Sequence, residues 1–97
     1  MSLHLYDVIK RPIITEGSTR DAAELNQFTF EVDLRANKIQ IKEAIELVFN
    51  VDVLKVATLI MPAKRGQRGR KKYVRAAAWK KAIVTLPQGQ KIPLFNL

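Results

Sequence analysis

Hydrophobic and polar residues alternate strictly from Gln27 to Asp33, which predicts a strand with one buried face. A second strand is predicted from Trp79 to Leu86, with Trp79, Lys81, Ile83 and Thr85 on one face and Lys80, Ala82, Val84 and Leu86 on the other. A third strand is predicted from Val51 to Met61, a stretch rich in β-branched residues that ends before Pro62. The core face of the first strand consists of Phe28, Phe30 and Val32.

A helix is predicted between residues 37 and 50, because hydrophobic residues recur there every three or four positions. Asn37 and Gln40 are placed to form a capping box at its start. A shorter helix is expected to end near residue 25, with either Thr15 or Ser18 as its cap. The hydrophobic stripe of the longer helix, which we expect in the core, consists of Ile41, Ala44, Ile45, Val48 and Phe49.

Together these elements predict an α+β fold, in which a small and mainly antiparallel sheet of three or four strands is packed with helices. A single helical turn is expected at residues 7–10, and a short edge piece after residue 91. The chain has 97 residues, which suits one domain spanning residues 1–97.

The net charge of +8 is distributed very unevenly along the chain. Up to Met61 there are seven Lys or Arg and nine Asp or Glu, a net charge of −2. From Pro62 onward there are ten Lys or Arg and no acidic residue, a net charge of +10. The pattern predicts a long basic hairpin loop at about residues 62–78, which joins two strands and lies on the phosphates of a nucleic acid.

The expected RNA contacts are the cations, glycines and aromatic residues of this basic stretch. Arg binds phosphate with two parallel hydrogen bonds, Lys acts as a point charge, and Gly lets the backbone approach RNA closely. Tyr73 is the better candidate for stacking on a base, because Trp79 fits a core position equally well. The predicted RNA-binding residues are Lys64, Arg65, Gly66, Arg68, Gly69, Arg70, Lys71, Lys72, Tyr73, Arg75, Trp79, Lys80 and Lys81.

Five of the cations leave alternatives open. Lys80 and Lys81 are expected on opposite faces of one strand, so at least one of them should face phosphate or protect a sheet edge. Lys10, Arg11 and Arg35 form either a second RNA contact or ordinary surface charge.

The residue inventory excludes most enzyme chemistry. His4 is the only histidine, there is no cysteine, and no phosphate-binding Gly-Lys-Ser/Thr loop is present. We therefore expect a protein that is not an enzyme and has no metal and no cofactor. No apolar run reaches membrane-spanning length and no signal peptide is recognisable, so we expect no membrane insertion. The absence of cysteine is compatible with a reducing cytosolic setting. The alternative function is a basic adaptor that binds acidic protein surfaces or anionic membranes.

Four stretches of the chain, in the right order and covering nearly all of it, resemble the bacterial L23 family of large-subunit ribosomal proteins. The most specific is the stretch from Trp79 to Leu86, with the Lys-Arg-Gly at residues 64–66 and the Gly-Arg at residues 69–70 ahead of it. The others are Arg11 to Glu16, Lys42 to Val51, and Val56 to Leu59.

The resemblance implies a structural protein that binds large-subunit ribosomal RNA beside the exit of the nascent-peptide tunnel, with its hairpin loop along the tunnel wall. The implied partners are neighbouring ribosomal proteins, trigger factor, the signal recognition particle and the protein-conducting channel. Glu16 matches the exposed acid of the family's chaperone-docking surface. Asn50 stands where some relatives carry a second docking acid, so only Glu16 carries over.

Overall fold

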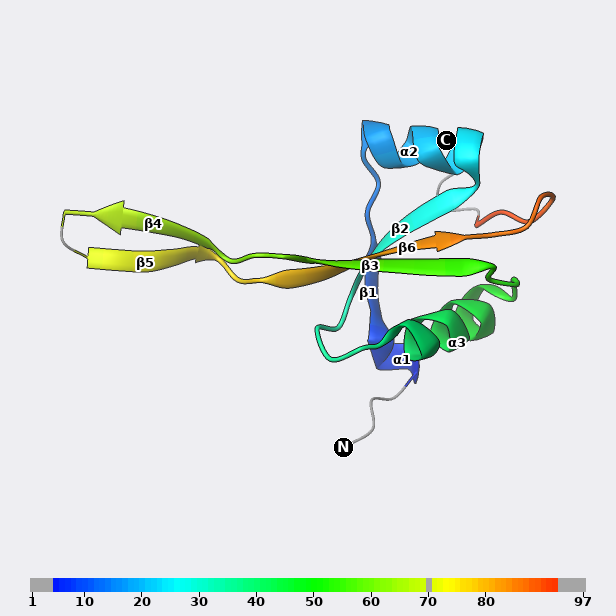
Figure 1. Cartoon of the computed structure of the whole chain (residues 1–97), viewed down its shortest axis with the longest axis horizontal. Coiled ribbons are helices and arrows are strands. Elements are labelled where there is room, and N and C mark those ends of the chain that lie inside the picture. The colour runs from blue at the N-terminus through cyan, green and yellow to red at the C-terminus, as the bar shows by residue number, and fades with distance from the viewer. Residues whose placement is uncertain (1–4, 70, 93–97) are drawn as a thin grey trace.

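A four-stranded antiparallel sheet forms the body of the protein, and a narrow two-stranded arm projects from it (Figure 1). The computed structural model describes residues 5–69 and 71–92, with only the backbone for residues 5, 6, 64–68 and 71–76. The molecule measures 54 × 36 × 17 Å along its principal axes. Its elements are α1 (Leu5–Val8), β1 (Ile9–Pro12), α2 (Glu16–Leu25), β2 (Gln27–Val32), α3 (Lys38–Phe49), β3 (Lys55–Met61), β4 (Lys64–Arg68), β5 (Lys71–Ala76) and β6 (Trp79–Thr85).

The strand order of the sheet is β1-β2-β6-β3, and every neighbouring pair is antiparallel. Helices α2 and α3 lie on opposite sides of it, above and below in Figure 1. The expected α+β fold with a small antiparallel sheet is therefore confirmed. Within the described residues no helix has both the length and the hydrophobicity needed to cross a membrane.

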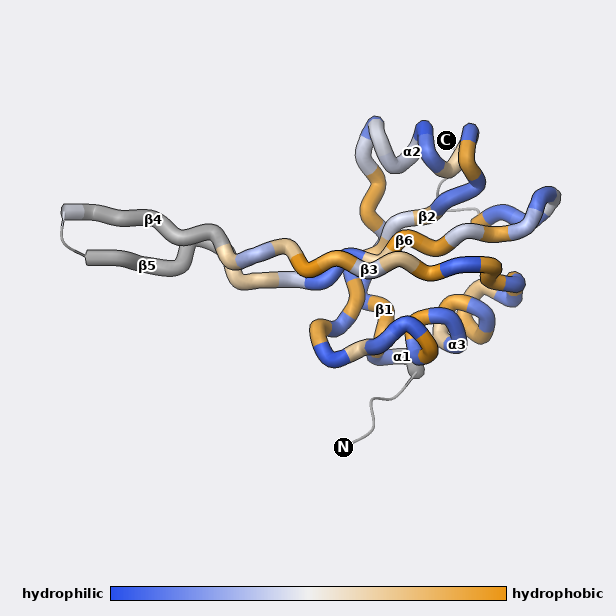
Figure 2. Tube along the Cα trace, in the orientation of Figure 1, coloured by the Kyte–Doolittle hydropathy of each residue, from blue (hydrophilic) through white to orange (hydrophobic). Residues whose placement is uncertain are grey.

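The core lies between α3 and the face of the sheet that carries the predicted hydrophobic residues of β2. Phe28 pairs with Val84 across β2 and β6. The side chains of Phe28, Phe30 and Val84 are each at most 1% exposed. From α3, Ile41 and Ile45 are fully buried against this layer. Each such side chain contributes about 1.5–3 kcal/mol through removal of its surface from water. Figure 2 shows the hydrophobic positions gathered along these elements of the body.

One residue of the predicted stripe, Val48, is not in the core, because its side chain is 44% exposed. The last turn of α3 is instead anchored by Phe49, whose ring centroid lies 5.5 Å from that of Phe30. Phe49 takes up the space at this end of the core and leaves Val48 facing solvent.

Both predicted helices begin with a capping box. In α3 the side chain of Asn37 accepts from the backbone N–H of Gln40 at 2.8 Å, and the Gln40 side chain accepts from the Asn37 N–H at 3.0 Å. In α2 the cap is Thr15, and Ser18 is its reciprocal partner three residues later. Of the two caps considered for this helix, Thr15 is therefore the correct one.

The structure differs from the sequence prediction near the N-terminus and at the start of β3. The helical turn lies at Leu5–Val8 rather than at residues 7–10, and it leads into an unexpected edge strand, β1, which pairs with β2. β3 begins at Lys55 rather than Val51, because residues 51–54 form a loop whose backbone bonds side chains of Glu46 and Gln90.

The segment expected as a basic loop also differs, because β4 and β5 within it pair as antiparallel strands. The edge piece expected after residue 91 falls mostly on residues 93–97, which lie outside the described part of the chain.

Asn26 ties the end of α2 to the segment that follows β6, and its replacement tests how much this link contributes. The residue adopts a left-handed conformation with φ 55°, and its side-chain nitrogen lies 2.7–3.0 Å from the carbonyl oxygens of Leu86, Pro87 and Gln90. Glycine tolerates this φ, so Asn26→Gly removes only the side-chain bonds. We expect the free energy of unfolding in urea to fall by about 1–3 kcal/mol.

Asn50 is the matched control, because it also ends a helix in a left-handed conformation, with φ 54°. Its side chain forms no hydrogen bond within the described residues. Asn50→Gly should leave the free energy of unfolding within about 0.5 kcal/mol of the parent. Equal losses in both variants would show that backbone conformation, and not the side-chain link, explains the effect at Asn26.

Candidate nucleic-acid interface

The basic arm is a hairpin of backbone-paired strands that extends from β3 and β6 away from the body (Figure 1). Its register places Gly66 opposite Tyr73 and Arg68 opposite Lys71. Gly69, the first residue of the turn, has a φ of 62°, a backbone conformation that residues other than Gly rarely adopt. Of the predicted RNA-binding residues, those placed on the two arm strands are Lys64, Arg65, Gly66, Arg68, Lys71, Lys72, Tyr73 and Arg75.

The remaining predicted residues lie near the turn or on β6. Arg70 falls outside the described part of the chain. Trp79, Lys80 and Lys81 open β6 at the foot of the arm, where the strand joins the main sheet. The structure therefore divides the predicted contact residues between the projecting arm and its foot.

Lys80 points to the core side of the sheet, where it is paired in register with Val32 and Ile60. Its ammonium group donates a hydrogen bond to the carbonyl oxygen of Ala36, a residue that is only 1% exposed. This bond closes the turn between β2 and α3. Lys80 has a structural partner within the protein, and Lys81, on the opposite face, is the one that faces outward as the alternation predicts.

Trp79 is half-buried and takes part in the walls of three separate hollows, of about 510, 410 and 390 Å³. One of these hollows lies between the outer sheet face and the first turn of α2, and it also contains Lys81 and Met61. Trp79 is thus neither a core residue nor fully exposed, and its surroundings leave room for a ligand on more than one side.

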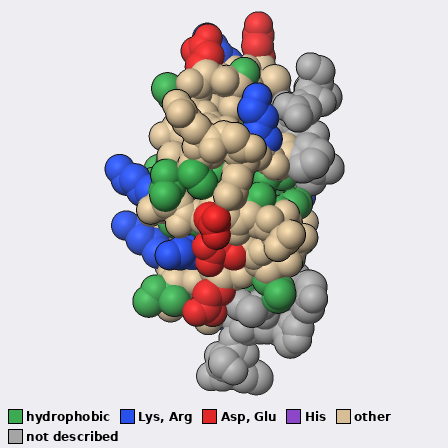
Figure 3. Space-filling model, turned by 90° about the vertical axis from the view of Figure 1, so that its right-hand side faces the viewer, with side chains coloured by type: hydrophobic (Ala, Val, Ile, Leu, Met, Phe, Trp, Pro, Cys, Tyr) green, Lys and Arg blue, Asp and Glu red, His purple; other side chains and the backbone are tan. Residues whose placement is uncertain are grey.

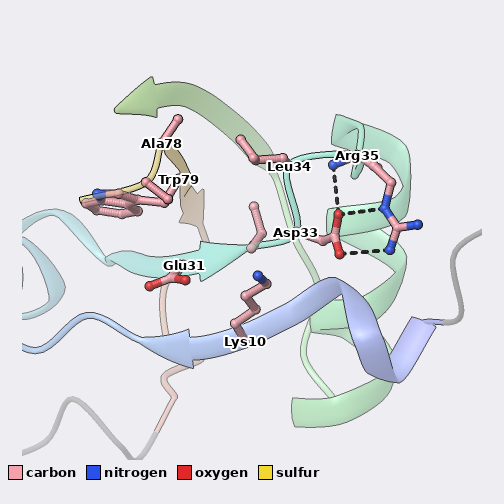
Figure 4. A pocket seen from close by; sticks show the side chains of 9 residues that line it. Lys10, Glu31, Asp33, Leu34, Arg35, Ala78 and Trp79 are labelled. Carbon is pink, nitrogen blue, oxygen red and sulfur yellow. Dashed lines mark hydrogen bonds and ion pairs between the residues drawn. The ribbon is translucent and has the colours of Figure 1, made fainter. Parts of the chain in front are cut away.

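A hollow of about 510 Å³ lies at the foot of the arm and brings together residues that are distant in sequence. Lys10 reaches into it from β1, and Arg35 and Trp79 lie on opposite sides of it (Figure 4). The sequence allows Lys10 and Arg35 to be either a second RNA contact or ordinary surface charge. It has no signal for this hollow, because only the pairing of β1 with β2 brings Lys10 beside the foot of the arm.

An ion pair with good geometry holds one wall of this hollow. The Asp33 carboxylate accepts from the Nε of Arg35 at 3.0 Å, from its Nη2 at 3.1 Å and from its backbone N–H at 2.9 Å (Figure 4). These hydrogen bonds from Arg35 lower the pKa of the Asp33 carboxyl from 3.8 to about 2. Asp33 therefore stays negative at neutral pH and neutralises much of the charge of Arg35.

Arg11 is also paired, because its Nε lies 2.8 Å from a carboxylate oxygen of Glu31. Among the three cations proposed for a second RNA contact, Lys10 alone has no ion pair within the described residues. Lys10 therefore has the freest charge of the three.

Glu16, the proposed docking residue, is exposed at the first position of α2. It lies on the side of the sheet opposite to α3 (Figure 1). Across the described residues, no group of three or more His, Cys, Asp or Glu side chains is placed to hold a metal ion.

Comparison with known proteins identifies the family. A family model described as "Ribosomal protein L23" matches residues 7–94, which is nearly the whole chain and includes the arm and helices α2 and α3. The chain belongs to the ribosomal protein L23 family.

Individual relatives support this assignment over their full lengths. The chain is 48% identical over 96 residues to the large ribosomal subunit protein uL23 of Anaeromyxobacter sp. (strain Fw109-5), covering 99% of this chain and 98% of that one. It is 45% identical over 95 residues to uL23 of Geobacter sulfurreducens, covering 98% and 100% of the two chains. It is 52% identical over 92 residues to uL23 of Heliobacterium modesticaldum, covering 94% of each.

The resemblance noted from four short stretches is thereby confirmed. L23 proteins are structural ribosomal proteins, so membership of the family agrees with the expectation that this protein is not an enzyme.

The different surroundings of Lys80 and Lys81 predict different effects of the same substitution. Lys80→Met keeps most of the side-chain stem but leaves the buried Ala36 carbonyl without its donor. We expect the free energy of unfolding in urea to fall by about 1–3 kcal/mol. Lys81→Met should change it by no more than about 0.5 kcal/mol. If the two variants lose equal stability, the bond from Lys80 to Ala36 is not a stabilising contact.

Proposed function

We propose that this protein is a structural constituent of the large ribosomal subunit and that it binds large-subunit ribosomal RNA through its basic arm. The name of the relatives, large ribosomal subunit protein, supports the first part of the proposal. The second part rests on one observation, a projecting hairpin with seven Lys or Arg residues between Pro62 and Ala78 and no acid to pair them. A protein of the bacterial ribosome works in the cytoplasm.

The shape of the arm suits contact with folded RNA. A two-stranded ribbon is narrow enough to lie along a groove or between RNA helices, and its cations release counterions when they meet phosphate. Backbone pairing between β4 and β5 fixes the path of the arm before binding, so less conformational entropy is lost on binding than for a flexible loop. The whole chain then acts as one RNA-binding domain whose body positions the arm.

The foot of the arm extends the proposed contact onto the body. Trp79 lines one hollow together with Lys10 and another together with Lys81. At the foot of the arm a base stacked on Trp79 would therefore have a lysine nearby to contact phosphate. Lys80 contributes mainly through its bond to Ala36, which holds the turn after β2 in place.

Family membership also supports a position at the exit of the nascent-peptide tunnel, as the resemblance implies. There the arm would follow the tunnel wall, and Glu16 on the opposite end of α2 from Asn26 would contribute to the docking site for trigger factor. The signal recognition particle and the protein-conducting channel are the other partners expected at this site. The alternative of a basic adaptor for acidic proteins or membranes finds less support, because the matched family is ribosomal.

Removal of three arm cations tests the RNA contact. We expect the combined substitution of Arg65, Arg68 and Arg70 by Ala to weaken binding to large-subunit ribosomal RNA. The slope of log K against log salt should flatten by about 0.7–0.9 for each phosphate contact that is lost. The measurement is a filter-binding titration at several salt concentrations.

The matched control removes the same charge from the body, by substituting Lys38, Lys42 and Lys91 with Ala. This variant should keep most of the slope. An unchanged slope in the arm variant, or an equal change in the control, would assign the contact to overall charge rather than to the arm.

Charge reversal at Glu16 tests the docking role separately. Glu16→Lys should lower the affinity of trigger factor for assembled ribosomes by roughly tenfold, which corresponds to the loss of one good charged contact. Incorporation into large subunits, measured by sedimentation, should be unaffected. Glu24→Lys, an exposed acid further along α2, is the control. Unchanged chaperone affinity in the Glu16 variant would remove this residue from the docking site.

A further inference from the structure

A small hollow of about 170 Å³ lies between the first turns of α3 and the start of β3. Four of the residues around it are aliphatic, namely Ile39, Val53, Leu54 and Val56, and the other three are lysines. The hollow is on the α3 side of the sheet, so neither Glu16 nor the arm takes part in it. Neither the proposed RNA contact nor the proposed docking surface explains it.

Two of the four aliphatic residues at this hollow are unusually exposed. Ile39 is 69% exposed and Leu54 is 67% exposed, the highest values among the large hydrophobic side chains of the described residues. Single exposed hydrophobic residues are normal on protein surfaces. Here two residues fifteen positions apart converge on one depression, which is the arrangement expected of an interaction site.

Three lysines, Lys38, Lys42 and Lys55, surround the aliphatic residues, and none has an ion pair within the described part of the chain. No Asp or Glu is among the residues that line the hollow, but acids lie close to it in sequence, and Glu43 directly follows Lys42. Glu46 accepts from the backbone N–H of Val53 at 3.1 Å, and Asp52 accepts from the side chain of Gln90 at 3.0 Å. Lysines are therefore the only charged residues in the lining of the hollow, and the Glu46 carboxylate reaches it only through the backbone of Val53. Figure 3, which views the end of the body opposite the arm, shows hydrophobic side chains beside Lys and Arg on one flank.

The hollow also adjoins an open sheet edge. β3 is the last strand in the order β1-β2-β6-β3, and among the described residues no strand pairs with its outer side. Between Lys55 and Met61 this edge has no proline, and its pairing with β6 shows no bulge. Natural proteins usually protect such an edge with a proline, a bulge or charged side chains, of which this strand has only Lys55, or cover it with another segment.

These features favour a polypeptide over other partners. Only a peptide backbone supplies the alternating donors and acceptors that extend a sheet edge. The residues around this hollow include no aromatic or guanidinium face for a nucleobase, and a phosphate held by the lysines would leave Ile39 and Leu54 uncovered. A second copy of the chain would bring its own three lysines against these three, which like-charge repulsion disfavours.

We propose that this surface binds an extended, acidic segment of a partner protein. An aliphatic side chain of that segment enters the hollow between Ile39 and Leu54, and its carboxylates face Lys38, Lys42 and Lys55. The backbone of the segment pairs with the outer edge of β3. This interaction is independent of the RNA contact, because the arm is not involved.

A peptide titration of the full-length protein, followed by NMR of its methyl and amide groups, tests the proposal. The probe is the peptide Glu-Asp-Thr-Leu-Thr-Asp-Glu, and the comparison peptide carries Ser in place of Leu. Both are raised to about 1 mM, which half-fills a site with a millimolar Kd. We expect saturable shifts at the methyl groups of Ile39 and Leu54 and at the amides of β3, for the Leu peptide only.

Variants separate the hydrophobic contact from the charge. Ile39→Ser and Leu54→Ser should each weaken binding of the Leu peptide by about tenfold. Leu25→Ser is the matched control, because Leu25 is 57% exposed but lies on α2. Lys42→Gln should also weaken binding, whereas Lys91→Gln, at an exposed lysine outside the hollow, should not.

Several results would overturn the proposal. Equal shifts with the Leu and Ser peptides would show that the peptides bind through charge alone and not through the hollow. The absence of shifts at about 1 mM would exclude binding of an extended acidic peptide at this surface. Shifts of the same methyl groups by a short single-stranded RNA or by phosphatidylglycerol vesicles, at lower concentration than the Leu peptide, would assign the surface to that partner. Shifts that grow with protein concentration alone would make it a contact between copies.

Discussion

The antiparallel pairing of β2 with β6 is the constraint on which the rest of the structure depends. Its register places Phe28 opposite Val84 and Phe30 opposite Ala82, so both strands turn their hydrophobic residues to α3. A slip of one residue would turn these side chains to the outer face and bring Glu31 and Lys81 into the core. β6 also carries β3 on its other side, and both strands continue into the arm. The packing of the core therefore sets the direction in which the arm leaves the body.

Charge is separated in space as well as along the sequence. The body pairs several of its charges locally, as in the ion pairs of Arg11 with Glu31 and of Arg35 with Asp33. The arm has no acidic residues, so its cations gain their favourable interactions only from an external polyanion. Lys80 is the exception among the predicted contact residues, because its ammonium group bonds the Ala36 carbonyl and stabilises the fold.

The three proposed interaction surfaces occupy different parts of the protein. The arm and its foot form one, Glu16 at the start of α2 lies on one side of the sheet, and the hollow between α3 and β3 lies on the other. A thin sheet with one longer helix on each side separates the last two surfaces. Occupation of one of these proposed surfaces would therefore leave the others accessible.

The sequence by itself determined the elements that depend on neighbouring residues. The two-residue period of side chains specified the faces of β2 and β6, and helical periodicity with the Asn37 capping box specified α3. The run of cations identified the arm, and four short stretches carried the family resemblance. These features are local, because a capping bond spans three residues and a strand's buried face is set by every second side chain. Tertiary structure decided what depends on distant partners. The short strand β1 forms by pairing with β2. Lys80, and not Lys81, donates a hydrogen bond to the buried carbonyl of Ala36. At the end of α3, Phe49 contacts Phe30 while Val48 is exposed to solvent. The meeting of Ile39 with Leu54 likewise arises only when α3 packs beside β3, since no pattern within either segment records which segment will lie against it.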